Sequence, residues 1–580
     1  MHAPEETTPG ASSRRVISRR AALRSLSGVA AVAVLSSCRP AAPPASGGTS
    51  STAAPAAPTP QPAPTQATGS PKPGGTLRIL ARLSPPNVAY YGGGFGMLVL
   101  GAPVYDQLAS VDISDPSIDY RASDKLLPRL AESWDLQPDG LAYTFHLRRN
   151  VRWHDGSPFT AQDVLATFDY VQNSKNAFPE KGLVVSVDHV EAPDDFTVKV
   201  ALKRRDADFL NDLSRVTNGL RILPKRILEN PDLIQQTMIG TGPFKVDSND
   251  LSKATVYVRN PDYWEPGKPY MDSIIIRHKL DRSAESAAFA ARQLEMIYPP
   301  DKNVLNATRA TVPDLVYGSV VQDLASTYIP NMKREPFGDV RVRRAMHLAV
   351  DRQSLNQALS SGDGVINPPG VWGLKEGWAI PPNELLTLPG FRPSKDEDIA
   401  QARQLLADAG RSSFRTSVIF PRSYNTAPII GQVVAESWRK IGIQLDLQPM
   451  EDAAYLAALN QGDYDIAYET NFNASPTAQW RNHLTSRGSL NNHGVNDPDL
   501  DRMIDEQAQE LDVAKRKQIW LDLQRALLDK LYIIPMVDQA NYAAWQPWVH
   551  DVRYSLSANI TLPAAQNIWI DTASVPAQAR

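Results

Sequence analysis

Cysteine is almost absent from this 580-residue chain, since Cys38 is the only one. No disulfide can therefore form within the chain, and the multi-cysteine patterns of zinc and iron–sulfur sites are excluded. Nine histidines are scattered without an HxH or HxxxH pair, so no metal site is predicted. No apolar run reaches the ~18–20 residues that a membrane-spanning helix needs. What remains is a long chain, sufficient for several domain-sized units with large cores.

Sequence motifs of common enzymes are also missing. The chain has no GxSxG, HExxH or GxxxxGK[ST] motif, and no GxGxxG that opens a helix. His154, Asp155 and Ser157 are too close together on a turn for relay geometry, so turn chemistry is the better interpretation. We therefore expect a protein that is not an enzyme and holds no cofactor.

Charge is unevenly distributed along the chain. The net charge is −3, but residues 1–37 carry five arginines against two glutamates, a net +3, which leaves −6 for the remainder. An acidic body argues against a nucleic-acid binder that relies on bulk positive charge. The basic segment precedes a charge-free stretch, residues 25–37, which is too short to span a bilayer and has the pattern of an export signal.

Cys38 lies where this apolar stretch stops. Residues 35–38 (LSSC) resemble the bacterial lipobox, in which the cysteine is lipidated and becomes the new N-terminus. Residues 18–24 (SRRAALR) are similar to a twin-arginine export signal, and the general secretory route stays open. The alternative for Cys38 is a lone cysteine in an ordinary helix. We expect residues 1–37 to be an export signal, and the protein to be extracytoplasmic and lipid-anchored to the cell membrane.

Residues 38–73 are expected to form a tether. Ten prolines lie between Pro40 and Pro73 among small and polar residues, and Lys72 is the only charge in that range. Such a composition cannot bury a core. The folded body is expected from about Gly74.

That body is predicted to be mixed α/β. Strands are indicated at Thr76–Leu80, by alternation from Leu141 to Leu147, and from Phe196 to Val200. Thr160 and Asp163 have the spacing of a capping box that opens a helix. Further helices are indicated by apolar faces at 399–409, at 428–441 and around 519–527.

Several segments together resemble one family. They are residues 74–78 (GGTLR), 128–134 (PRLAESW), 143–148 (YTFHLR), 153–164 (WHDGSPFTAQDV), 240–244 (GTGPF), 259–264 (RNPDYW), 337–345 (FGDVRVRRA) and 349–352 (AVDR). This series is similar, in order, to the dipeptide/oligopeptide/nickel group of extracytoplasmic solute-binding proteins, family five, the receptors of ABC importers. Each segment alone is weak, but together they are specific.

The resemblance implies a two-lobed periplasmic-binding-protein-like fold of type II, with a hinge and an extra subdomain. Lobe I would comprise 74–315, with the subdomain at about 113–215, and a return at 537–580. Lobe II would comprise 316–536. The strands that cross between lobes would lie near 316–328 and 532–542. The tryptophans of the family-like segments are expected to be core anchors.

Ligand contacts are expected from lobe II loops. Arg422-Ser423-Tyr424-Asn425 resembles the Arg-Pro-Tyr-Asn segment of dipeptide receptors, whose Arg and Tyr hold the ligand carboxylate. A guanidinium can bind a carboxylate bidentately, so the chemistry is suitable. The alternative is a surface arginine at a helix entrance.

The amine-binding end departs from the family. Peptide receptors carry an Asp in a Trp-x-x-Asp-x-x-Asp-Pro stretch, and the corresponding residues here are 469–476 (ETNFNASP), with Phe472 and Ser475 at the Asp positions. An enclosed, unpaired ammonium would cost several kcal/mol. Free dipeptides are therefore disfavoured, and blocked peptides, organic acids, opine-like compounds and oligosaccharides become competitive. Glu469 could substitute from a shifted position, with Asn471 and Asn473 beside it.

Four aromatic residues on loop-like stretches could stack on a ligand, although each is individually more often a packing residue: Tyr90, Tyr91, Trp372 and Trp480. The expected function is capture of a small solute or peptide and its delivery to an ABC permease with a separate ATPase, because the chain has no P-loop of its own. A monomer is expected. A sensor that does not import, or a secreted hydrolase, is the alternative.

Overall fold

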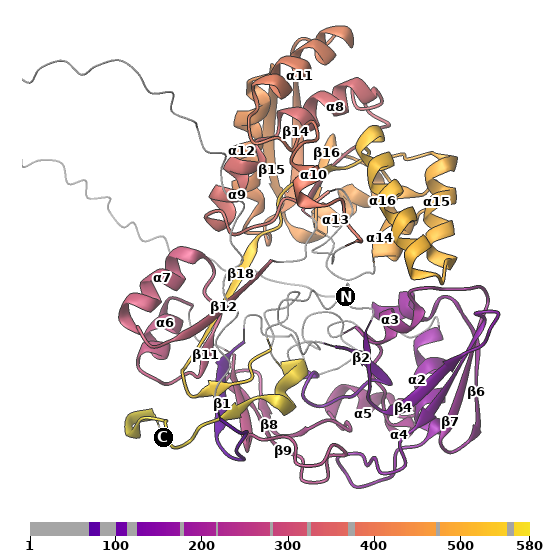
Figure 1. The fold of residues 1–580 in the computed structure, drawn as a ribbon, viewed down its shortest axis with the longest axis vertical. Coiled ribbons are helices and arrows are strands. Elements are labelled where there is room, and N and C mark those ends of the chain that lie inside the picture. Colours follow the sequence, from indigo (N-terminus) through magenta and orange to yellow (C-terminus); the bar gives the residue numbers. More distant parts are fainter. Residues whose placement is uncertain are drawn as a thin grey trace, which may run out of the picture. The chain divides into compact units, whose positions relative to one another are not determined.

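The computed structural model describes residues 69–81, 100–112, 125–173, 179–215, 219–278, 282–321, 326–368, 377–470, 476–553 and 562–579. The predicted export signal, Cys38 and most of the predicted tether lie outside the described residues. Two large sheets organise the described body (Figure 1). Each of them has its own hydrophobic core.

The first large sheet has seven strands and gathers residues from both ends of the body. Its order is β12 (Val316–Val321), β18 (Ala540–Trp545), β11 (Met296–Ile297), β1 (Thr76–Leu80), β10 (Ser273–Arg277), β9 (Ala254–Arg259) and β8 (Phe244–Asp250). The predicted strand at 76–80 is confirmed as β1, which pairs in parallel with β10 and β11. Helices α6 (Arg282–Ala290) and α7 (Lys302–Thr311) pack on strands of this sheet, whereas α4 (Lys225–Leu228) packs on α2 of the subdomain, with α5 (Pro231–Gln236) beside it.

A four-stranded antiparallel sheet forms the subdomain. Its order is β4 (Ala131–Leu136), β5 (Ala142–Leu147), β7 (Thr197–Leu202) and β6 (Val187–Asp194). The alternation along β5 is as expected, because Tyr143, Phe145 and Leu147 are buried, whereas Leu141 lies just before the strand and is exposed. The subdomain also holds α2 (Ala161–Gln172), α3 (Phe209–Leu213) and η2 (Pro179–Val184).

The predicted capping box at the start of α2 is confirmed. The backbone N–H of Thr160 donates to Asp163 Oδ2 at 3.0 Å, and the box is complete in both directions. Asp163 also accepts from Trp153 Nε1 and from the backbone of Lys225, at 3.3 and 2.9 Å. One buried carboxylate thus fixes the helix start, a tryptophan of the family-like segment and the start of α4.

The second large sheet has five strands in the order β15 (Ile443–Met450), β14 (Phe414–Pro421), β16 (Ile466–Glu469), β13 (Thr327–Pro330) and β17 (Ile534–Pro535). Strands β15, β14 and β16 are parallel to one another, and β13 pairs antiparallel with both β16 and β17. β14 is buried on both faces: Val418 and Phe420 join the core formed with α12, and Ile419 packs with residues of α13. Burial on both faces is expected of parallel strands.

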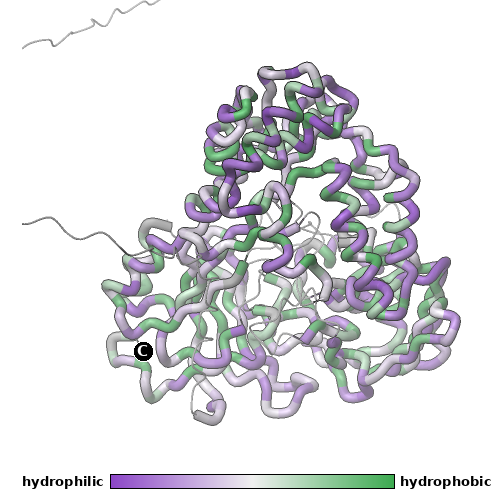
Figure 2. Tube along the Cα trace, turned by 45° about the horizontal axis from the view of Figure 1, so that its top comes forward, coloured by the Kyte–Doolittle hydropathy of each residue, from purple (hydrophilic) through white to green (hydrophobic). Residues whose placement is uncertain are grey.

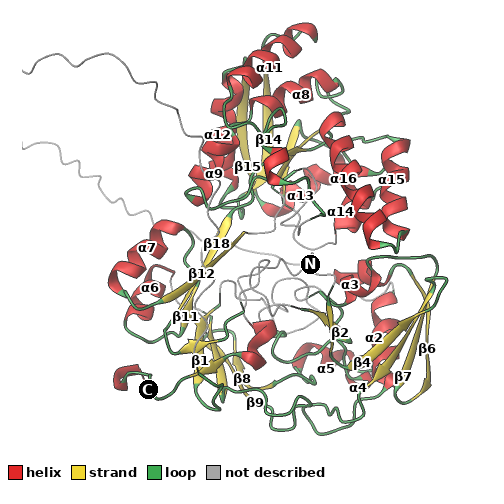
Figure 3. Cartoon of the chain, in the orientation of Figure 1, coloured by secondary structure: helices red, strands yellow, loops and turns green. Residues whose placement is uncertain are grey.

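Helices dominate the second half of the body (Figure 3). They are α8 (Val340–Ala349), α9 (Arg352–Ser360), α10 (Pro382–Leu385), α11 (Asp396–Asp408), α12 (Ala427–Arg439), α13 (Asp452–Gln461), α14 (Pro476–Leu484), α15 (Pro498–Gln509) and α16 (Val513–Lys530). The three predicted helices are confirmed as α11, α12 and α16. Figure 2 shows hydrophobic positions recurring between hydrophilic ones along these helices, as amphipathic helices require.

Two chain segments pass from one large sheet to the other. The first connects β12 of the seven-stranded sheet to β13 of the five-stranded sheet, and the second returns from β17 to β18. These are the segments predicted to cross. Smaller pairs are β2 (Ala109–Val111) with β3 (Leu126–Pro128), and β19 (Val549–His550) with β20 (Trp569–Ile570); η3 (Leu562–Asn567) and η4 (Ala577–Ala579) lie near the C-terminal end.

Among the described residues, none of the helices is both long and apolar enough to cross a bilayer.

Candidate functional site

Three parallel strands of the five-stranded sheet end at the same edge. Arg422 directly follows β14, Glu451 follows β15, and Glu469 is the last residue of β16. In open α/β sheets, ligands bind outside the carboxyl ends of the strands. This edge, here called the carboxyl edge, therefore brings together two of the predicted ligand residues, Arg422 and Glu469, with Tyr424 close by in the chain.

Arg422 presents an accessible cation at this edge. Its side chain is 63% exposed, and its Nε lies 3.4 Å from Glu451 Oε1, whose side chain is 78% exposed. Its backbone N–H donates to the carbonyl of Met450 at 2.8 Å, which ties the loop after β14 to the end of β15. An exposed ion pair contributes only about 0–1 kcal/mol, so an anionic ligand can replace Glu451 at little cost.

Tyr424 is held more firmly than Arg422. Its ring packs edge-on against Tyr468, with centroids 6.1 Å apart and planes at 84°, and Tyr468 packs in the same way against Tyr328. Burial raises the pKa of Tyr424, and a hydrogen bond with Thr470 opposes that shift. The neutral phenol is therefore fixed by packing beside the carboxyl edge.

Glu469 faces a histidine that the sequence did not indicate. Its Oε2 lies 3.4 Å from His483 Nδ1, which comes from the last turn of α14, and the two side chains are 15% and 10% exposed. Burial raises the pKa of Glu469, and His483 opposes that shift. The His483 ring stacks on His493 at 6.4 Å, and burial lowers the pKa of His493 to about 3. His493 is therefore neutral at physiological pH.

Trp480 lies in a core rather than at a binding surface. It is 1% exposed, and its ring centroid lies 4.1 Å from that of Trp520 in α16. α14 uses this ring to pack on α16, so the structure supports the packing alternative for Trp480 and offers no ring face for a ligand. The other predicted contacts, Asn471, Phe472, Asn473, Tyr90, Tyr91 and Trp372, lie outside the described residues and stay predictions.

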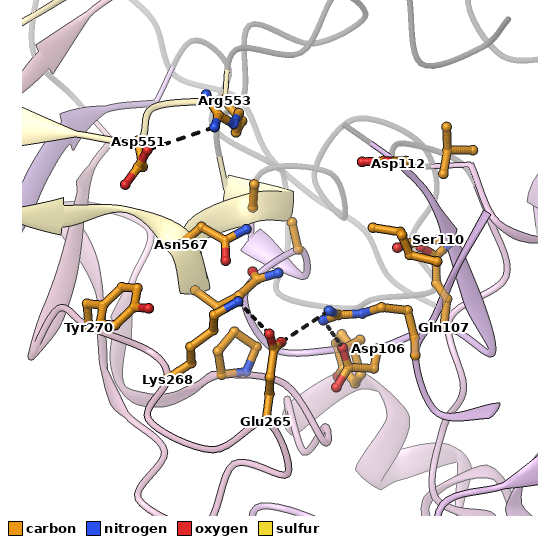
Figure 4. A pocket seen from close by; sticks show the side chains of 18 of the residues that line it. Asp106, Gln107, Ser110, Asp112, Glu265, Lys268, Tyr270, Asp551, Arg553 and Asn567 are labelled. Carbon is orange, nitrogen blue, oxygen red and sulfur yellow. Dashed lines mark hydrogen bonds and ion pairs between the residues drawn. The ribbon is translucent and has the colours of Figure 1, made fainter. Parts of the chain in front are cut away.

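The half of the body that holds the seven-stranded sheet contains a polar cavity of about 330 Å³ (Figure 4). Sequence reasoning did not identify it, because its walls come from β2, the loop after β9 and the segment after β19. Part of its lining is a connected set of ion pairs, in which Arg129 contacts Asp106 at 2.9 Å and Glu265 at 3.5 Å, and Glu265 pairs with Lys268. These four charges neutralise one another, and four further charged residues line the cavity: Asp112, Arg221, Asp551 and Arg553.

His154 has a structural role. Its Nε2 lies 3.0 Å from the carbonyl of Gly242, and its Nδ1 accepts from the backbone N–H of Gly240 at 3.3 Å. Asp155 accepts from Ser157 and from Arg226. The expected turn chemistry is confirmed for Asp155 and Ser157. No group of three or more His, Cys, Asp and Glu residues able to hold a metal occurs in the described part of the chain.

Two sheets joined by two crossing segments, with ligand-type side chains at the carboxyl edge of one, define a solute-binding protein of the two-lobed type. The sequence model of one protein family, 'Bacterial extracellular solute-binding proteins, family 5 Middle', matches residues 125–491. The chain belongs to this family.

A curated relative agrees with this assignment, and solved structures share the fold. Di/tripeptide-binding protein 1 of Pseudomonas aeruginosa is 26% identical over 470 residues, covering 75% of this chain and 84% of the relative. A putative peptide-binding protein, AppA, from Clostridium difficile has a TM-score of 0.73 at 19% identity, covering 86% of this chain and all of that one. The PBP AgaA from A. tumefaciens R10, solved with agropinic acid, has a TM-score of 0.68 at 21% identity, covering 86% and 99%.

Proposed function

We propose that this protein captures a small organic solute between its two lobes and delivers it to an ABC import permease driven by a separate ATPase. Family membership supports this role, and the carboxyl edge with Arg422 and Tyr424 is the observation that carries it. An open form would sample closure, and a ligand that contacts both lobes would stabilise the closed form. Capture and delivery require no covalent step.

The proposed ligand carries a carboxylate and has no free α-ammonium group that must be enclosed. Arg422 supplies an accessible planar cation for the carboxylate, and Tyr424 supplies a fixed phenol next to it. In the ungapped correspondence with peptide receptors, the Asp that pairs with the ammonium group becomes Phe472, and the Asp before the proline becomes Ser475. Relatives bind di- and tripeptides in one case and agropinic acid in another, so both ligand classes belong in the test.

We also propose that Cys38 anchors the protein to the membrane through lipid, and that residues 38–73 tether the body, as a monomer, near its permease. A tether of this kind raises the effective concentration of the receptor at its partner. Labelling with a radioactive fatty acid in the native host tests this: incorporation should occur in the unaltered protein and be lost in Cys38→Ser. Equal labelling of both would contradict the lipidation.

Ligand capture is tested by thermal unfolding of the full chain carrying Cys38→Ser, in the presence of free dipeptides, N-acetylated peptides, organic acids and opine-type acids. A ligand at 100 times its dissociation constant stabilises by about 2.7 kcal/mol, which is a visible shift of the midpoint. N-acetylated peptides or opine-type acids should give the shift. Strong shifts by free dipeptides alone would contradict the proposed ligand class.

Arg415 provides a matched control for Arg422. It is also an exposed arginine paired with an acidic residue across β14 and β15, but it lies near the amino end of β14. Arg422→Ala should abolish the ligand-dependent shift, whereas Arg415→Ala should preserve it. Equal shifts in both variants would show that the carboxyl edge is not the site.

A further inference from the structure

The contact between the subdomain with the four-stranded sheet and the helices of the other half includes a buried ion pair. Asp208, at the start of α3, lies with its Oδ1 2.6 Å from Nη2 of Arg516, in the first turn of α16. The two side chains are 15% and 8% exposed. These residues are more than 300 positions apart, so their contact depends on how the two halves meet.

Arg516 is well placed for this contact because its guanidinium is held from several sides. Nη1 donates to the carbonyl of Ala207 at 3.3 Å, and Nη2 also reaches the side-chain oxygens of Gln507 and Thr477 at 3.3 and 3.4 Å. The guanidinium carbon lies 5.6 Å from the ring centroid of Trp378. A planar cation fixed in this way loses little freedom when it pairs with a carboxylate.

Two further contacts lie beside the ion pair. The backbone N–H of Ala207 donates to the carbonyl of Ala508, in α15, at 2.9 Å. Gly140, in the turn between β4 and β5, has a φ of +73°, and a Cβ there would lie 2.6 Å from Leu511 Cδ1. The subdomain therefore meets the helices through a backbone hydrogen bond, a close apolar contact and a buried ion pair.

This contact is connected to the candidate ligand site through α14. Thr477, which Arg516 contacts, is the second residue of α14 and follows directly on the predicted ligand segment 469–476. The same helix carries His483, the partner of Glu469. A single short helix thus connects the carboxyl edge with the ion pair.

We propose that the Asp208–Arg516 pair is a latch that holds the subdomain against helices α14, α15 and α16, and stabilises the closed form of the protein before any ligand binds. This proposal rests on the proposed function in one respect, because capture of a ligand requires the two lobes to close. Thr477 also exchanges hydrogen bonds with Gln507 at 3.2 and 3.0 Å, so the start of α14 stays attached to α15 and α16 when Asp208 separates from Arg516. By favouring the closed form, the latch lowers the free-energy cost of closure on a ligand. The latch therefore adjusts the affinity for whichever solute is captured.

The latch is tested on the full chain without ligand, by electron paramagnetic distance measurement between two spin labels. The only native cysteine is removed as Cys38→Ser, and labels are attached through Glu191→Cys in β6 and Arg502→Cys in α15, both at exposed side chains. In the otherwise unchanged protein, a short distance should be the major component. In Arg516→Gln and in Asp208→Asn, the ratio of closed to open molecules should fall at least about tenfold.

Arg525→Gln is the matched control, because Arg525 lies on the same helix and pairs with Glu384 and Asp522, but is 46% exposed. It should leave the distance distribution unchanged. If Arg516→Gln fails to fold by circular dichroism, Asp208→Asn, which keeps the shape of its side chain, decides alone. The proposal would be overturned by an unchanged distance distribution in Asp208→Asn. It would also be overturned if the protein with both latch residues intact were mainly open. Since no ligand is present, these outcomes are independent of the ligand tests above.

Discussion

Arg343 is expected to be among the most sensitive positions of the fold. It lies in the family-like segment 337–345, and its side chain is only 4% exposed. Nη1 donates to the carbonyls of Phe337 and Gly338 at 2.7 and 3.0 Å, while Nη2 and Nε donate to the carbonyls of Lys530 and Leu531 at 2.7 and 3.1 Å. It therefore caps the C-terminal end of α16 and fixes the loop before α8 at once.

Arg343→Met keeps most of the side-chain volume but removes every donor. A buried carbonyl left without a donor costs about 1–3 kcal/mol, and this applies to Phe337 and Leu531, which are buried. The carbonyls of Gly338 and Lys530 belong to exposed residues and can find water, so we expect a loss of about 2–6 kcal/mol in the free energy of unfolding. That is a large fraction of the ~5–15 kcal/mol of a typical domain.

The neighbouring Arg344 is a control within the same segment. It donates to a single carbonyl, that of Asp529, at 2.9 Å and at the surface, so Arg344→Met should cost less than about 1 kcal/mol. Guanidinium-induced unfolding, followed by tryptophan fluorescence, measures both variants. The reasoning is refuted if Arg343→Met lies within 1 kcal/mol of Arg344→Met.

Three further predictions follow from buried groups. Burial holds the pKa of His154 near 4, below its usual 6.5. As the pH falls, the unfolded state therefore gains a proton before the folded state does. The free energy of unfolding should drop between pH 6.5 and 4, with a slope of about 1.4 kcal/mol per pH unit from this group. Urea titrations should show that slope reduced in His154→Asn but not in His189→Asn, an exposed histidine; equal slopes would contradict this. In the same assay, Trp480→Ala should lower the free energy of unfolding by about 3–5 kcal/mol, because a buried ring is removed. A variant that keeps its stability and loses only ligand binding would show instead that Trp480 stacks on the ligand. Gly240→Ala should prevent folding, since a Cβ there would lie 1.8 Å from a backbone oxygen, whereas Gly182→Ala, with open space, should fold; soluble expression of both would be inconsistent with the packing described.

Much of the fold could be predicted because its signals are local. The capping box at Thr160 and Asp163 depends on residues three positions apart, and the apolar faces of α11 and α12 repeat with the helical period. The family-like segments added the order of the lobes. Leu141 shows the limit of a periodic pattern, since the alternation does not say where the strand begins, and this residue lies outside β5.

The site could be predicted only in part, because its contacts join distant residues. Arg422 and Tyr424 follow a strand and precede a helix, so their place at the carboxyl edge could be anticipated. The contact of Glu469 with His483 joins the end of β16 to the last turn of α14, and nothing in the sequence between them indicates it. Trp480 looked like a loop residue because its partner, Trp520, lies 40 positions later on another helix.

The position of β18 has a consequence for the order in which the protein can be assembled during synthesis. This strand lies between β12 and β11, and it supplies the hydrogen bonds that attach β12 to the seven-stranded sheet. Until residue 545 has left the ribosome, β12 has no neighbour in that sheet, although the residues of β13 to β16 are already available. A nascent or truncated chain that lacks 540–545 therefore exposes two unpaired strand edges, which are sites of aggregation. Of the two large sheets, the one that begins first in the sequence is thus the one that is completed last.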